Sequence, residues 1–161
     1  MPRFSQGDIF TLFATKQIDV AIVFGHIGLN EMNLYWEEFK NAHDNFAEIR
    51  DPFLEIPERP VCVSNDQWLW FVPEKENHGM TDDQLVSAIE KPIGWALNHG
   101  LTKIATNGII NIDHGSVTLR NRESVDRRVH FLAALVSDHE QNSSLSIELI
   151  SLNDAFVRNV A

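Results

Sequence analysis

Apolar and polar positions along the first half of the chain alternate between the period of strands and the period of helices. Residues 18–24 form a short, β-branched and nearly continuous apolar run, which predicts a strand covered on both faces. Over residues 29–49 the apolar residues recur at helical spacing and most charged residues lie off that stripe, which predicts an amphipathic helix. Residues 60–63 predict a short strand. Residues 67–72 predict a stronger, central one, because aromatic and β-branched residues fall on both faces.

Local signals mark the ends of a second helix that follows these strands. Thr81 and Gln84 match a capping box, in which Thr81 is the N-cap and the Gln84 side chain reaches back to it. Pro92 lies inside the helical pattern and predicts a kink or a break into two helices. Residues 98–100, Asn-His-Gly, predict the C-terminal cap.

The remainder of the chain repeats the order of strand and helix. Residues 102–106 predict a short strand, and Ser124 is the expected N-cap of a helix that runs to about residue 138. Residues 145–152 alternate cleanly and predict the strand that closes the sheet. Residues 153–154 then start a short helical turn that carries Phe156. Strands and helices in this order predict an α/β fold, a three-layer α/β/α sandwich.

Composition narrows the class of protein without indicating a function. A length of 161 residues favours one domain, residues 1–161, and a net charge of −10 argues against duplex nucleic acid or an anionic membrane as the main partner. No apolar run is long enough for a transmembrane helix, and the first residues lack the apolar core of a signal peptide. The single cysteine, Cys62, fits a cytoplasmic protein and, in its apolar context, is expected to be a small buried side chain.

The sequence carries no strong catalytic motif. It has no phosphate-loop lysine motif, no His-Glu-x-x-His, no Gly-x-Ser-x-Gly and no dinucleotide fingerprint. The pair Asp113-His114 is too short a signal for a metal site. We therefore expect no metal and no cofactor, and no residue is assigned a catalytic role.

Four segments fall at predicted strand ends, where open α/β sheets collect ligands. The first two are residues 7–9, Gly-Asp-Ile, and residues 25–28, Gly-His-Ile-Gly. Asp8 could accept a hydrogen bond from an exocyclic amine or could close a turn. The glycines of the second segment, Gly25 and Gly28, could present backbone N–H groups to an anion, or could form an ordinary tight connection.

The other two segments follow the later strands. Residues 106–115 are rich in small and side-chain-amide residues, so they could wrap a pyrophosphate or a sugar; the Asn107-Gly108 pair is equally typical of a hairpin turn. In residues 153–156 the Phe156 ring could stack on a purine, or could cap the hydrophobic core.

One cluster of cations interrupts the acidic background. It consists of Arg120, Arg122, Arg127 and Arg128. These side chains could face a phosphate. The favoured interpretation is a solvated helix start paired with Glu123 and Asp126.

Taken in order, these segments resemble the macrodomain family, whose members typically bind ADP-ribose. Residues 7–9 followed by Ile-Asp-Val-Ala-Ile-Val at 18–23 are similar to the opening of the family and its Asp-Ala-Ile-Val strand. Lys-Ile-Ala-Thr at 103–106 leads to Gly108-Ile109, similar to the Gly-Ile loop of the family. The strand at 147–152 with an aromatic shortly after it completes a resemblance that is distant but covers most of the chain.

The resemblance implies a mixed sheet and a role for individual residues. Asp8 would receive the adenine amine with Ile9 beside the base, and Phe156 or Asn153 would flank the adenine. Gly108 and Ile109 would cradle the phosphates and the distal ribose.

The chain departs from the family at the second of the four segments. Phe24 stands where the family has an asparagine, and residues 25–28 replace a triple-glycine loop. In hydrolytic members that loop positions the distal ribose and a catalytic water, a role in which His26 or Asn30 could substitute. The resemblance thus implies binding more directly than hydrolysis.

The first hypothesis is therefore binding of ADP-ribose or a related nucleotide at the strand ends, with hydrolysis of ADP-ribosyl derivatives left open. Its expected ligand-binding residues are Asp8, Ile9, Phe24, Gly25, Gly28, Asn107, Gly108, Ile109, Asn153 and Phe156. The alternative is a non-enzymatic acidic interaction protein with a protein partner, of the inhibitor, immunity or phage accessory type. A third hypothesis is a metal-dependent nucleotide hydrolase of another α/β family.

Overall fold

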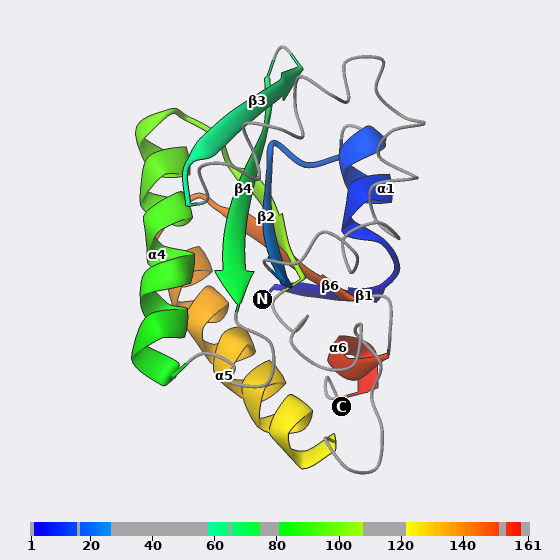
Figure 1. The fold of residues 1–161 in the computed structure, drawn as a ribbon. Coiled ribbons are helices and arrows are strands. Elements are labelled where there is room, and N and C mark those ends of the chain that lie inside the picture. The colour runs from blue at the N-terminus through cyan, green and yellow to red at the C-terminus, as the bar shows by residue number, and fades with distance from the viewer. Residues whose placement is uncertain are drawn as a thin grey trace.

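The computed structural model describes residues 2–15, 17–26, 58–64, 66–74, 81–107, 122–151 and 154–158. These residues form a six-stranded sheet of order β1-β6-β5-β2-β4-β3 with helices packed against it (Figure 1). The strands are β1 (Arg3–Gln6), β2 (Val20–His26), β3 (Pro60–Ser64), β4 (Gln67–Glu74), β5 (Lys103–Thr106) and β6 (Ser146–Ser151). The helices are α1 (Ile9–Ala14), α4 (Asp82–Asn98), α5 (Arg122–Gln141) and α6 (Ala155–Arg158).

The direction of the strands decides where a ligand site can form. Strands β1, β6, β5, β2 and β4 run parallel, whereas β3 pairs with β4 in the antiparallel direction, so the sheet is mixed. All five parallel strands therefore end at the same side of the sheet, which we call the carboxyl edge. Its members are the last residues of those strands and the residues that follow them; the opposite side is the amino edge.

Two hydrophobic cores lie on opposite faces of the sheet. The larger core, on the side of α4, α5 and α6, includes Phe24, Ile89, Leu132 and Phe156. The smaller core lies on the side of α1 and includes Ile9. Figure 1 shows α4 and α5 on one side of the sheet and α1 on the other. The predicted α/β fold with a mixed sheet is confirmed; the helix predicted at residues 29–49 lies outside the described residues.

Strand β2 shows why its sequence is apolar at nearly every position. Val20, Ile22 and Phe24 belong to the larger core, while Ala21 and Val23 belong to the smaller one. Both faces of the strand are thus removed from water, as the continuous apolar run predicts.

Helix α4 confirms the predicted caps and corrects one expectation. Gln84 N donates to Thr81 Oγ1 over 3.2 Å and Thr81 N donates to Gln84 Oε1 over 3.0 Å, which completes the capping box. The helix ends at a His99 C-cap, followed by Gly100 at φ +71°. The expected break at Pro92 is wrong: the 17-residue helix is continuous. Pro92 is itself buried with the apolar face of α4, so packing against the sheet holds the helix together around the missing N–H.

The N-terminal strand β1 and the short helix α1 were not predicted from the sequence. Strand β1 has one apolar residue, Phe4, and therefore no alternating signal. It forms because it pairs with β6, where Arg3 lies opposite Glu148. Arg3 Nε and Glu148 Oε1 are 3.6 Å apart in an ion pair. Strand β6, predicted to close the sheet, therefore lies inside it and not at its edge, and Glu148 is buried.

Two single-residue expectations are also wrong. Helix α5 begins at Arg122, so Ser124 lies inside the helix and is not its N-cap. Cys62 is exposed, because β3 is an edge strand whose Val61 and Val63 face the smaller core and leave Cys62 on the other side. Val125, Val129, Leu132 and Val136 of α5 are buried.

Candidate functional site

The carboxyl edge brings together four chain segments that are far apart in the sequence. Residues that follow β1, β6, β5 and β2 lie on four neighbouring strands, in that order across the sheet. They belong to the segments at 7–9, 153–156, 106–115 and 25–28 that the sequence singled out. Because parallel strands end together, the described residues of these segments, 7–9, 25–26, 106–107 and 154–156, lie at one edge.

Asp8 lies at the outer end of this row, between β1 and α1. Gly7 N donates to Ser151 O over 2.7 Å, which joins the ends of β1 and β6. Asp8 O then accepts from Thr11 N over 3.1 Å, the first turn of α1. Ile9 is buried in the smaller core. Asp8 is thus held at the edge by hydrogen bonds on one side and by a buried neighbour on the other.

Asn107 connects the end of β5 to β2, at the other end of this row. Phe24 N donates to Asn107 Oδ1 over 2.8 Å, and Asn107 Nδ2 donates to Phe24 O over 3.2 Å. Asn107 is 5% exposed, so both hydrogen bonds are shielded from water. The side chain that the sequence indicated as a ligand contact or a hairpin residue is therefore bound to the backbone of β2.

Two aromatic rings support the edge from the larger core. Phe24 and Phe156 are both fully buried, so neither ring is exposed for stacking in this structure. For Phe156 this matches the reading in which the ring caps the core. The Arg128 guanidinium lies 5.5 Å from the centre of the Phe24 ring, a cation–π contact between α5 and β2.

Thr106, the last residue of β5, adds a buried polar group beside this contact. It pairs with Ile22 of β2 and is 1% exposed. Its Oγ1 has no hydrogen-bond partner. A hydroxyl that is buried without a hydrogen-bond partner lowers the stability of the folded state, so Thr106 destabilises the fold at this position.

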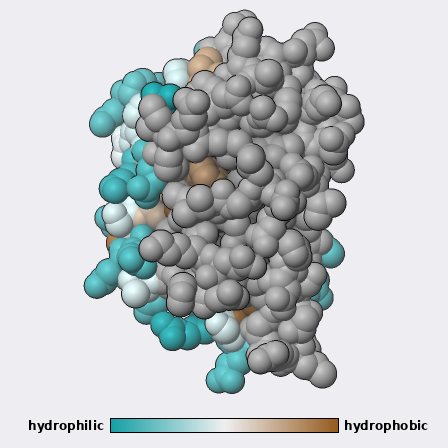
Figure 2. All heavy atoms as spheres, in the orientation of Figure 1, coloured by the Kyte–Doolittle hydropathy of each residue, from teal (hydrophilic) through white to brown (hydrophobic). Residues whose placement is uncertain are grey.

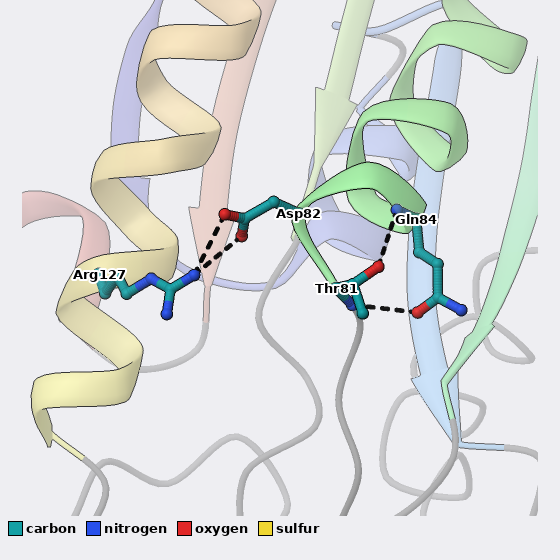
Figure 3. A network of polar contacts seen from close by, with 4 residues as sticks. All are labelled: Thr81, Asp82, Gln84 and Arg127. Carbon is teal, nitrogen blue, oxygen red and sulfur yellow. Dashed lines mark hydrogen bonds and ion pairs between the residues drawn. The ribbon is translucent and has the colours of Figure 1, made fainter.

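Ion pairs connect the three helices that begin at the carboxyl edge. Arg127 Nη2 lies 3.1 Å from Asp82 Oδ1, which joins α5 to α4 beside the capping box (Figure 3). Arg158 Nη2 lies 2.6 Å from Asp126 Oδ1, which joins α6 to α5. Arg127 therefore pairs with another helix, and not with Glu123 or Asp126 as the sequence indicated. The first turn of α4 carries Asp82 and Asp83 and a complete capping box, so it does not attract an anion.

Several expected site residues lie outside the described residues. They are Gly28, Asn30, Gly108, Ile109, Asp113, His114, Arg120 and Asn153. Gly25 and His26 lie in β2, opposite Pro73 and Glu74 of β4. The sequence missed the contact of Arg128 with Phe24, although Arg128 belongs to the arginine cluster that it did single out.

The amino edge is fastened in a different way. Asp19 Oδ2 accepts hydrogen bonds from Lys103 N over 3.1 Å and from Thr102 N over 3.3 Å, which holds the start of β5 to β2. Gln67 Nε2 donates to Ile18 O over 3.0 Å.

An aromatic group closes the same end. Trp68 and Trp95 pack edge to face with their ring centres 5.0 Å apart, and His99 stacks on Trp95 at 4.4 Å. The amino edge is therefore occupied by contacts within the protein.

The described surface carries few apolar side chains. Figure 2 shows mainly hydrophilic residues on the described part of the face, along the side of α4 and α5. The large hydrophobic residues with high exposure in the described ranges are Leu97, at 41%, and Val157, at 40%, on separate helices. No described helix is both long and apolar enough to cross a membrane. Within the same ranges, no three His, Cys, Asp or Glu side chains are grouped to hold a metal ion.

Comparisons with known proteins support the fold. No family model and no curated protein sequence matches the chain. Solved structures do match, among them a chain described as alphavirus P23pro-zbd, with a TM-score of 0.58 and 9% identity. The match covers 99% of this chain and 23% of that one, so this chain spans about a quarter of its length. At this identity the likeness shows the fold, an α/β sandwich around a mixed sheet.

Proposed function

We propose that the chain binds ADP-ribose or a related nucleotide at the carboxyl edge of its sheet. The observation that carries the proposal is that β1, β6, β5 and β2 are neighbouring parallel strands, and that the sequence indicates a segment of ligand contacts at the end of each of them. The macrodomain-like fold supports the same ligand class. The expected contacts are Asp8 and Asn153 near the base, and Gly25, Gly28, Gly108 and Ile109 near the phosphates and the distal ribose.

The negative charge of the chain is compatible with this ligand. Backbone N–H groups bind a pyrophosphate without the help of lysines, and glycine-rich segments present such groups. Phe24, Ile9 and Phe156 support these segments from the two cores. Arg128 adds a cation on the α5 side of the edge. The proposal ends at binding and assigns no catalytic residue.

The test is calorimetric titration with ADP-ribose of the wild-type chain, Asp8→Asn and Asp66→Asn. Asp8→Asn keeps the shape of the side chain and its capping ability but removes the charge that would receive the adenine amine. We expect wild type to bind and Asp8→Asn to bind about tenfold more weakly, the equivalent of one charge-assisted hydrogen bond. Asp66 is an exposed carboxylate in the turn before β4, at the amino edge, so Asp66→Asn should bind like wild type.

Two results would contradict the proposal. Absence of heat with wild type at high micromolar ADP-ribose would exclude this ligand. An affinity of Asp8→Asn equal to that of wild type would remove Asp8 from the site. The acidic interaction protein gains no support from the described surface, where exposed large apolar side chains are isolated.

A further inference from the structure

The double hydrogen bond between the Asn107 side chain and the Phe24 backbone replaces a piece of β-sheet. Pairing between β2 and β5 ends at Ile22 and Thr106, while β2 continues to His26 beside β4. A side-chain amide carries the same donor and acceptor as a backbone peptide group. The Asn107 amide therefore takes the place that a peptide group of β5 would take if the pairing continued.

This replacement lets β5 end while β2 goes on. Phe24 is fully buried, so its N–H and C=O need partners on the β5 side. Asn107 supplies both of them. The N–H and C=O of Phe24 are thus satisfied after the pairing with β5 has ended, and the end of β5 stays fixed to β2 at that position.

We propose that Asn107 is a positioning residue of the nucleotide site. Its amide holds the carboxyl ends of β2 and β5 in one register and so fixes where the segments after them begin. The inference rests on the proposed function, because residues 25–28 and 108–109 are the expected phosphate and ribose contacts. Asn107 acts on the ligand through the backbone of Phe24, without contacting the ligand itself.

The substitution Asn107→Asp tests this role by chemistry. A protonated carboxyl donates to Phe24 O and accepts from Phe24 N, as the amide does. An ionised carboxylate only accepts, and it repels the Phe24 carbonyl oxygen. Burial raises the pKa of the introduced carboxyl above its ordinary range, so the protonated form becomes more populated as the pH falls. Arg128 over the Phe24 ring opposes this shift but stays charged throughout.

The experiment is titration of ADP-ribose into wild type, Asn107→Asp and Asn98→Asp at a series of pH values, after a denaturant titration has shown each variant to be folded. Asn98 is exposed at the end of α4, so Asn98→Asp is the matched control and should bind like wild type. We expect Asn107→Asp to bind ADP-ribose about tenfold more weakly than wild type at pH 8. The difference in affinity between the two proteins should become smaller as the pH falls. Dividing the affinity of the variant by that of wild type at each pH cancels the titration of groups that the two proteins share.

The outcomes separate this inference from the function it rests on. If wild type gives no heat, the proposed function is wrong and this role falls with it. If wild type binds but Asn107→Asp matches it at every pH, only the positioning role is overturned. A weaker affinity with a ratio independent of pH would mean that Asn107 contacts the ligand directly, and this also overturns the positioning role.

A second variant tests the same role if Asn107→Asp does not fold at high pH. Asn107→Ser is neutral at every pH and cannot supply both partners at the reach of the amide. We expect it to bind more weakly than wild type by a factor that does not change with pH. An unchanged affinity of this variant would overturn the role.

Discussion

The amino and carboxyl edges of the sheet both fasten β5 to β2, but with different side chains. At the amino edge the Asp19 carboxylate, half-buried, accepts hydrogen bonds from two backbone N–H groups of the residues that lead into β5. At the carboxyl edge the neutral Asn107 amide, buried, both accepts and donates. A charged acceptor is tolerated at a position in contact with water. A neutral group that both donates and accepts hydrogen bonds is better suited to a buried position. The difference indicates that the two edges have separate tasks.

Other side chains also differ between the amino edge and the carboxyl edge. At the amino edge Trp68 packs edge to face against Trp95, His99 stacks on Trp95, and Gln67 Nε2 donates to the backbone. At the carboxyl edge Arg128 lies over Phe24, and Thr106 Oγ1 is buried without a partner. Asp19 and Gln67 at the amino edge thus have partners within the protein, whereas the carboxyl edge keeps an unsatisfied group where ligands bind in sheets of this kind.

The largest expected effect is that of Phe24→Ala. Phe24 is fully buried beneath the carboxyl edge, so removing the ring leaves a cavity and should lower the free energy of unfolding by about 3–5 kcal/mol. Trp68→Ala at the amino edge should cost less, because Trp68 is only partly buried. Urea denaturation with the midpoint compared at constant m measures both changes. A larger loss for Trp68→Ala would reverse the ranking of the two edges.

The next effect concerns Asp19. Asp19→Ala leaves the N–H groups of Thr102 and Lys103 without their acceptor and should lower the free energy of unfolding by about 1–3 kcal/mol. Affinity for ADP-ribose should stay unchanged, since the contact lies at the opposite edge from the proposed site. Denaturation and calorimetry on the same sample measure the two quantities. A tenfold loss of affinity in folded Asp19→Ala would show that the edges are not independent.

The smallest effect has the opposite sign. Thr106→Val replaces a buried hydroxyl that has no partner by a methyl group of the same shape, so stability should rise by about 1 kcal/mol. Thr102→Val is the matched control, because Thr102 is only partly buried at the amino edge, and it should change stability less. A loss of stability in Thr106→Val would mean that the hydroxyl is satisfied, for example by water, and would remove one contrast between the edges.

The sequence predicted best those features that are determined locally or by burial on both faces. The α4 caps were predicted because Thr81 and Gln84 are three residues apart and bond to each other. Strands β2 and β4 were predicted because burial on both faces leaves them nearly continuous in apolar residues.

Features that depend on distant partners were not predicted. Strand β1 has little apolar pattern of its own and forms through its pairing with β6. The role of Asn107 depends on Phe24, which is 83 residues away in the sequence. Without that partner the Asn107-Gly108 pair indicated only a turn. Of the candidate site, the sequence therefore identified the segments that meet at the carboxyl edge, but not the side-chain contacts that join them.

The strand order determines when each strand can pair while the protein is being synthesised. Strands β2, β3 and β4 pair among themselves and have been synthesised before α4 is complete. Strand β1, the first to emerge, pairs with β6, the last. At common rates of translation β1 waits for roughly ten seconds or longer. During that time Gly7 N lacks its bond to Ser151 O, so the Asp8 corner of the site is expected to be the last part of the nascent chain to form.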